Sequence, residues 1–212
     1  MSWRSLLVVA LLLLAGCSNG GSNRGGTYTF NPQQAPTKVD TAQLRAEKAA
    51  AGIQACPASD AGSVARPGGM PAVTLPCLGG GREVHLAGVK GPAVVNFWAQ
   101  WCEQCRAESP ILQQLHSASR GRVAVLGVDW QDPRPSYAIA FAKQLGLTYP
   151  QIADPTAVTR APMHITGLPM TFFIDGSGAI SYTQFGPVES AAQLAELVKQ
   201  HLGVQVTLGE PR

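Results

Sequence analysis

Residues 96–106 read Asn-Phe-Trp-Ala-Gln-Trp-Cys-Glu-Gln-Cys-Arg, and this stretch decides the fold. A Cys-x-x-Cys pair alone is ambiguous, because zinc ligands, structural disulfides and redox pairs share its spacing. Here an apolar run over 93–99 predicts a buried strand, and the residues from Cys102 to about Ser119 predict a helix. Cys102 would then meet the free N–H groups at the helix start, which favour the attacking thiolate. Cys105, one turn further in and more buried, is predicted to resolve the mixed disulfide.

Strand patterns extend on both sides of this stretch. From about residue 70 onward they alternate with helix patterns, which predicts a mixed α/β sheet with helices on its faces. Gly79–Gly81 and Gly176–Gly178 each separate two short strand patterns, so a hairpin is expected at each. Residues 123–128 predict a second buried strand beside the first.

Three helices are expected in this region. The first, which begins at the cysteines, contains Pro110 and should kink there. The second follows Pro135, with one face formed by Tyr137, Phe141 and Leu145. The last begins at Ser190, which forms a capping box with Gln193, and its apolar stripe comprises Leu194, Leu197, Val198 and Leu202.

Together these motifs resemble the thioredoxin fold, and more closely the TlpA/ResA group of membrane-tethered, extracytoplasmic thiol-disulfide oxidoreductases. Residues 98–105 match the active-site segment of that group, and Pro110 falls where thioredoxins kink their active-site helix. Residues 167–175 match the segment that holds the family's cis-proline. The resemblance covers about residues 70–203. It implies a central mixed β-sheet flanked by helices, with an N-terminal β-hairpin extension.

The resemblance also implies roles for residues around the cysteines. The Leu168–Pro169 bond would be cis and would face the cysteine pair, so that free backbone groups can dock a substrate strand; a trans turn is the alternative. Trp101, directly before the nucleophile, is expected to form a wall of the docking groove. Glu103 matches an acid of the ResA-type motif and could tune the thiols, or it could be a solvated residue in the first turn of the helix.

The sequence departs from the family pattern at two positions, and the second of them leaves the redox direction open. Asn96 stands where thioredoxin itself carries a buried Asp, and Gln104 stands where most relatives have Pro. Residues between the cysteines help to set the balance between dithiol and disulfide. The expected activity is reduction of protein disulfides, and the resemblance implies that these are disulfides between the haem-binding cysteines of apocytochrome c. An oxidase is the alternative, and a copper-delivery module that uses His164 is a second one.

Two further cysteines, Cys56 and Cys77, remain besides Cys17 and the redox pair. In an oxidising compartment a structural disulfide between them is the simplest interpretation, and it would close a loop of about 22 residues. A second redox pair that relays electrons and a zinc site that uses all four thiols are alternatives. No cofactor and no metal are expected for the catalysis.

The N-terminal residues predict a targeting segment for export from the cytoplasm. Residues 1–16 have one positive charge and an apolar run too short to span a bilayer, which is typical of a signal peptide. Residues 14–17, Leu-Ala-Gly-Cys, resemble a bacterial lipobox, so Cys17 is expected to carry lipid, with an ordinary secretory signal as the alternative. Residues 17–55 are then a flexible tether on the extracytoplasmic side of the membrane.

The last expectations concern the domain boundaries, which the sequence pattern indicates, and the partners, which the family resemblance implies. The domain is expected over 56–205 and a C-terminal tail over 206–212. A net charge of +3 with only 14% charged residues does not support nucleic-acid binding. The expected partners are protein thiols and disulfides, an upstream membrane thiol-disulfide electron carrier, and the membrane through the lipid anchor. The chain is expected to be a monomer.

Overall fold

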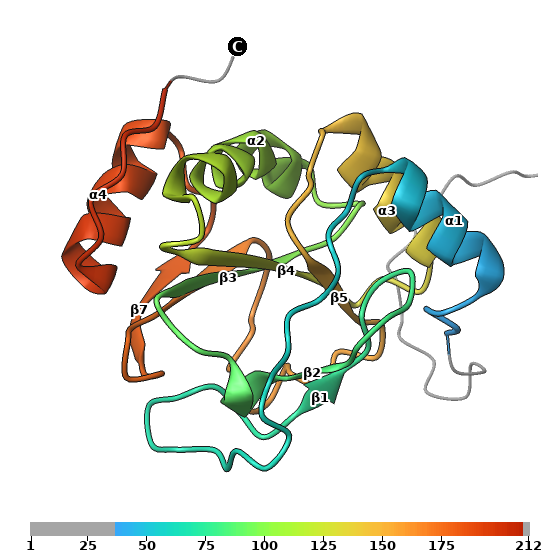
Figure 1. Cartoon of the computed structure of the whole chain (residues 1–212), viewed down its shortest axis with the longest axis horizontal. Helices are drawn as coiled ribbons and strands as arrows, with labels where there is room; N and C mark the ends of the chain where they lie inside the picture. The colour runs from blue at the N-terminus through green and yellow to red at the C-terminus, as the bar shows by residue number, and fades with distance from the viewer. Residues whose placement is uncertain (1–36, 210–212) are drawn as a thin grey trace, which may run out of the picture. The chain divides into compact units, whose positions relative to one another are not determined.

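The computed structural model describes residues 37–209, so the expected signal peptide, Cys17 and the end of the tail lie outside the described residues. A five-stranded sheet with the order β5-β4-β3-β6-β7 forms its centre (Figure 1). Its strands are β3 (Ala93–Trp98), β4 (Ala124–Trp130), β5 (Gln151–Asp154), β6 (Met170–Ile174) and β7 (Ile180–Phe185). β3, β4 and β5 are parallel, whereas β6 and β7 run antiparallel. The mixed sheet of a thioredoxin-like fold is therefore confirmed.

Side chains alternate across the sheet and form two cores. Val94, Trp98 and Phe173 face a core to which α1 (Ala42–Ala50), α2 (Glu103–Ser119), α3 (Pro135–Gln144) and α4 (Ala191–Leu202) all contribute. Val95 and Phe97 face the opposite core, which is covered by β1 (Thr74–Leu75), β2 (Val84–His85) and the 3-10 turn η1 (Leu86–Gly88). Both expected hairpins are present, because β1 pairs with β2 and β6 pairs with β7.

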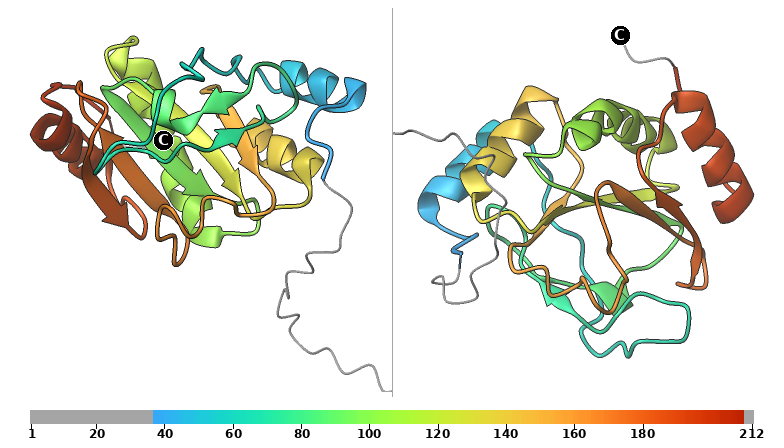
Figure 2. Two further views of the ribbon diagram at one scale, coloured as in Figure 1. Left: turned by 90° about the horizontal axis from the view of Figure 1, so that it is seen from below. Right: turned by 180° about the vertical axis from the view of Figure 1, so that it is seen from behind.

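The expected tether is ordered from residue 37 onward, and this corrects the predicted domain boundary. Thr41 caps α1, and both views in Figure 2 place this helix beside α3. Leu44 and Ile53 are buried in the same core as the other helices. Nine residues of helix are marginal in water alone, but burial of an apolar face against α3 stabilises them.

Two smaller expectations also need correction. Tyr137 does not belong to the buried face of α3, because it is 61% exposed and its ring lies under the Arg134 guanidinium. The face that packs inward carries Ala138, Ile139, Phe141 and Ala142 instead. The expected tail is ordered at its start, since Val206 packs into the helix-side core. No helix between residues 37 and 209 has the length and apolar character needed to cross a bilayer.

Candidate functional site

The cysteine pair lies where β3 passes into α2. Cys102 is the N-cap residue of α2, and its Sγ accepts a hydrogen bond from the backbone N–H of Cys105 at 3.1 Å. The two sulfurs form a disulfide, with the Cα atoms 5.3 Å apart. Cys105 is fully buried, whereas Cys102 keeps 8% of its surface exposed. An incoming group therefore reaches Cys102 first, and the N–H that its sulfur accepts would stabilise a thiolate there.

The Leu168–Pro169 peptide bond is cis, and it leads directly into β6. Met170 pairs with Phe97, the penultimate residue of β3, so Pro169 lies at the end of the sheet from which the cysteines follow. The carbonyl oxygen of Pro169 accepts a hydrogen bond from Gly186 N–H, which holds this loop against the end of β7. The proline loop precedes β6 and the cysteines follow β3, so both lie at the same end of two neighbouring strands.

The two tryptophans before the pair have different surroundings. Trp101 lies directly before the N-cap cysteine and is 50% exposed. This exposure is compatible with the expected place in a docking groove. Trp98 is buried, stacks on Phe141 and donates a hydrogen bond from Nε1 to Gln151 Oε1 at 2.9 Å. Trp98 is therefore a packing residue, whereas Trp101 is open to solvent.

The acid that the fold buries near the pair is Glu108, which the sequence reasoning did not single out. Its Oε1 accepts from Asn96 Nδ2 at 2.7 Å and its Oε2 accepts from Val188 N–H at 2.9 Å. Burial outweighs both bonds and raises the pKa of Glu108 to about 7. Glu108 follows Cys105 by three residues, so both lie on the same face of α2. The sequence contains one signal for this role, which is an acidic residue three positions after the second cysteine.

Glu103, the acid that the resemblance selects, lies in the first turn of α2 with its side chain exposed. Asn96, at the position of the buried Asp of thioredoxin, is itself buried. Besides its bond to Glu108, Asn96 Nδ2 donates to Thr171 Oγ1 at 2.9 Å. The carboxyl group that Asn96 orients therefore comes from α2, and the amide comes from the central strand.

A second group of acids lies at the end of β4. Asp129, which pairs in register with Trp98, is fully buried, and neither carboxyl oxygen has a hydrogen-bond partner within the described chain. Burial, reinforced by the nearby carboxyl groups of Asp132 and Asp154, raises the pKa of Asp129 well above its usual value. Burial therefore favours the protonated form of this carboxyl group over the charged form.

Cys56 and Cys77 form a second disulfide, with Cα atoms 5.9 Å apart. Leu78 N–H donates to the carbonyl oxygen of Gln151, so the bridge attaches the segment before β1 to the edge strand β5. The four cysteines thus form two separate disulfides, Cys56–Cys77 and Cys102–Cys105. Within residues 37–209, no group of three or more His, Cys, Asp or Glu side chains is arranged to hold a metal ion.

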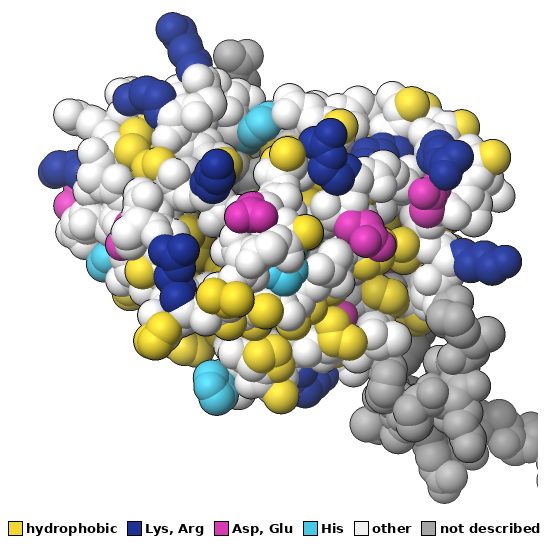
Figure 3. Space-filling model, turned by 60° about the horizontal axis from the view of Figure 1, so that its bottom comes forward, with side chains coloured by type: hydrophobic (Ala, Val, Ile, Leu, Met, Phe, Trp, Pro, Cys, Tyr) yellow, Lys and Arg dark blue, Asp and Glu magenta, His cyan; other side chains and the backbone are white. Residues whose placement is uncertain are grey.

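Charged side chains are dispersed rather than concentrated on the face drawn in Figure 3. Lys and Arg side chains are scattered over this face with fewer Asp and Glu among them, and apolar side chains are densest in its lower middle part. His164, the residue that the copper alternative requires, is exposed and has a positive φ of 52°.

The chain matches proteins of known family. The model of the AhpC/TSA family matches residues 69–183. A thiol:disulfide interchange protein DsbE homolog from Paracoccus denitrificans is 40% identical over 99 residues, which are 46% of this chain and 52% of the relative. The chain thus spans about half the length of that relative. DsbE of Pseudomonas fluorescens biotype C is 32% identical over 133 residues, 62% of this chain and 72% of that protein.

A solved structure supports the same similarity. The thiol:disulfide interchange protein DsbE from Chlorobium tepidum superposes with a TM-score of 0.55 at 26% identity. The match covers 66% of this chain and 96% of that one.

Proposed function

The chain belongs to the AhpC/TSA family within the thioredoxin fold, and from this premise we propose that it is a thiol-disulfide oxidoreductase that reduces protein disulfides. The observation that carries the proposal is the asymmetry of the pair at the start of α2. Cys102 is the partly exposed N-cap residue, its sulfur accepts an N–H, and the buried Cys105 is bonded to it. Relatives named thiol:disulfide interchange proteins support the same chemistry.

In the reductase direction, the Cys102 thiolate attacks one sulfur of the partner's disulfide, and the partner's other sulfur leaves as a thiolate. Cys105 then attacks Cys102 Sγ, which releases the second partner thiol and forms the disulfide seen here. Cys105 must lose its proton for this step. Glu108, one turn further on the same face with a pKa of about 7, is suited to hold that proton near neutral pH. Pro169 and Trp101 would border the docked strand.

The proposed setting is extracytoplasmic. A lipid on Cys17 would tether the domain to the membrane, and an upstream membrane thiol-disulfide carrier would supply the electrons. Haem-binding thiols of apocytochrome c are the proposed substrate class, as the resemblance to the TlpA/ResA group implies. Mass spectrometry of the mature N-terminus tests the anchor: an acylated Cys17 supports it, and an unmodified Cys17 rejects it.

The central experiment traps the partner. Cys105→Ala in the native host should accumulate a mixed disulfide on Cys102, which is isolated under acid quench and identified by mass spectrometry. The double variant Cys102→Ala, Cys105→Ala is the matched control and should trap nothing. A reduction potential near that of thioredoxin supports the reductase, and one at the strongly oxidising end shows an oxidase. Absence of any trapped partner, together with background insulin reduction, would reject the catalytic proposal.

A further inference from the structure

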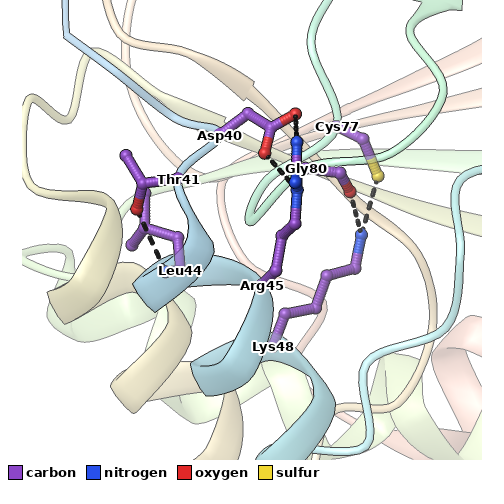
Figure 4. Close-up of polar contacts among 7 residues, drawn as sticks. All are labelled: Asp40, Thr41, Leu44, Arg45, Lys48, Cys77 and Gly80. Carbon is purple, nitrogen blue, oxygen red and sulfur yellow. Dashed lines mark hydrogen bonds and ion pairs between the residues drawn. The ribbon is translucent and has the colours of Figure 1, made fainter.

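Lys48 of α1 is buried against the second disulfide, far in sequence from the cysteines it touches. Its ammonium donates hydrogen bonds to Cys77 Sγ and to the carbonyl oxygen of Gly80, each at 2.9 Å (Figure 4). Only 8% of Lys48 is exposed. Lysine is almost never buried to this degree without an acidic partner, because an unpaired ammonium loses its hydration.

No carboxylate within the described chain lies at ion-pair distance from Lys48. Asp40, an acid whose charge acts on Lys48, forms an ion pair with Arg45, in which Nε and Oδ1 are 2.7 Å apart. Burial outweighs the field of Asp40 and lowers the pKa of Lys48. A disulfide sulfur is a weak, neutral acceptor, so the two acceptors that the ammonium contacts, this sulfur and the Gly80 carbonyl oxygen, are both uncharged. A thiolate at Cys77 would compensate the ammonium charge.

The surroundings of the two sulfurs differ in the way that an asymmetric redox pair requires. Cys77 lies beside a cationic donor. Cys56 Sγ lies 3.3 Å from the carbonyl oxygen of Gln151, an acceptor that suits a protonated thiol, and Cys77 Sγ lies farther from the same oxygen, at 3.7 Å. Cys77 is followed by the buried residues Leu78–Gly80, whereas Ala55 and Pro57 on either side of Cys56 are exposed. A small outward movement of this surface segment would expose Cys56 before Cys77.

We infer that Cys56–Cys77 is a second redox centre, in which Lys48 holds Cys77 as a thiolate after a protein dithiol has reduced the bridge. A thiolate of the dithiol attacks Cys56 Sγ, the bond between Cys56 and Cys77 breaks, and its electron pair stays on Cys77 Sγ next to the ammonium. The second thiol of the partner, losing its proton, attacks the mixed disulfide. Cys56 leaves, takes up that proton and donates to Gln151, and the partner ends as a disulfide.

This inference concerns other cysteines than the proposed catalytic pair, so it stands or fails independently of the proposed function. It also assigns a purpose to α1 beyond packing, since the helix delivers the cation. Lys48 acts here as a positioning residue that stabilises one protonation state. Its role is therefore measured on Cys77 itself, by equilibrium and by titration.

The first test compares the chain with Lys48→Met and Lys48→Arg in dithiothreitol redox buffers. After acid quench and differential alkylation, mass spectrometry gives the reduced fraction of each pair from one digest. Loss of a charge-assisted hydrogen bond should lower the equilibrium constant for reduction of Cys56–Cys77 about tenfold in Lys48→Met. Lys48→Arg should restore most of it, and the Cys102–Cys105 equilibrium should stay unchanged. An unchanged Cys56–Cys77 equilibrium in Lys48→Met would overturn the inference.

The second test does not depend on folding of the Lys48 variants. In Cys56→Ser, Cys77 is a free thiol beside the native Lys48, and its alkylation rate is followed against pH. We expect a midpoint at least one unit below the ordinary cysteine value of about 8.5. A midpoint at or above that value would show that Lys48 does not stabilise the thiolate, and would reject the second redox centre.

Discussion

Asn96 Nδ2 donates a hydrogen bond to Glu108 Oε1 at 2.7 Å, which ties the central strand to the helix that carries the cysteines. Val188 N–H binds the other oxygen of the same carboxyl group at 2.9 Å. The three residues come from β3, α2 and the loop before α4, so the buried acid is oriented from three sides. The protonation state of Glu108 should therefore affect both the free energy of unfolding and the pH dependence of disulfide reduction.

The first prediction concerns the stability of the chain against pH. Unfolded Glu108 loses its proton near its reference pKa of 4.5, whereas the folded chain keeps it until about pH 7. The folded state therefore binds more protons in this window, and the free energy of unfolding should fall by about 3 kcal/mol as pH rises from 4.5 to above 7. Glu108→Gln should remove this contribution and keep that of Asp129, so urea unfolding at several pH values should show the variant gaining about 3 kcal/mol relative to the unmodified chain between pH 4.5 and 7.

The matched control for Glu108 is Glu103→Gln, which changes an exposed acid on the same helix. Its stability profile should follow that of the unmodified chain. In insulin reduction, Glu108→Gln should change the pH profile between pH 6 and 8, and Glu103→Gln should not. The opposite pattern would return the role of the tuning acid to Glu103, as the family resemblance implies.

The second prediction concerns Asp129. Its pKa is raised well above the usual value, so the unfolded state releases a proton at lower pH than the folded state. Asp129→Asn should therefore gain stability relative to the unmodified chain as pH rises above about 4, and the gap should widen toward neutral pH. Chemical unfolding at pH 4, 5.5 and 7 measures that gap. A constant difference across the three values would mean that Asp129 is ionised in the folded protein.

The third prediction separates docking from chemistry at Trp101. Trp101→Ala should lower kcat/KM for a protein disulfide such as insulin about tenfold, because a half-exposed aromatic group beside the nucleophile contributes contact area to a bound chain. The rate with a small aromatic disulfide should change less, since that substrate covers little of the surface.

Val64→Ala provides a control for Trp101, because Val64 is also exposed. Val64 belongs to the loop whose Arg66 binds the carbonyl oxygen of Ser177 in the β6–β7 turn, at the far end of β6 from Pro169. Its substitution should leave both rates unchanged. Equal losses for the two substrates in Trp101→Ala would show that the tryptophan affects the cysteines rather than docking.

The fourth prediction concerns the loop closed by the second disulfide. Cys56 and Cys77 are 21 residues apart, and the chain-entropy estimate for such a loop is about 3 kcal/mol. The double variant Cys56→Ala, Cys77→Ala should lose about that much free energy of unfolding, measured by urea titration of the oxidised proteins. A loss below about 1 kcal/mol would show that the unfolded chain is already constrained in this region.

Local sequence patterns predict the parts of this fold that depend on local signals. The spacing of Cys102 and Cys105, the strand before them and the glycines at both hairpin turns indicate the sheet and the position of the pair. The cis-proline segment is recognisable only through the family resemblance, because a sequence does not show which isomer of an X-Pro bond its fold selects.

The features that the sequence does not predict depend on contacts between distant segments. α1 is too short to be stable alone and forms because α3 covers its apolar face. Glu108 reads as a solvated helix residue until Asn96 and Val188 enclose it. The four-residue strand β5 begins with the polar Gln151, whose side chain binds Trp98, so its pattern carries no strand signal.

Gly79 lies outside α1, but the packing of α1 leaves no room for a side chain at this position. A Cβ atom there would lie 2.8 Å from Lys48 Cβ, 3.0 Å from the Leu44 carbonyl oxygen and 3.2 Å from Ile139 Cδ1, and the residue has a positive φ of 72°. Any chain that seats a helix in this way must keep this position free of a side chain. A relative with a side chain in this alignment column therefore cannot seat a helix in this way, even where its leading segment has diverged beyond recognition.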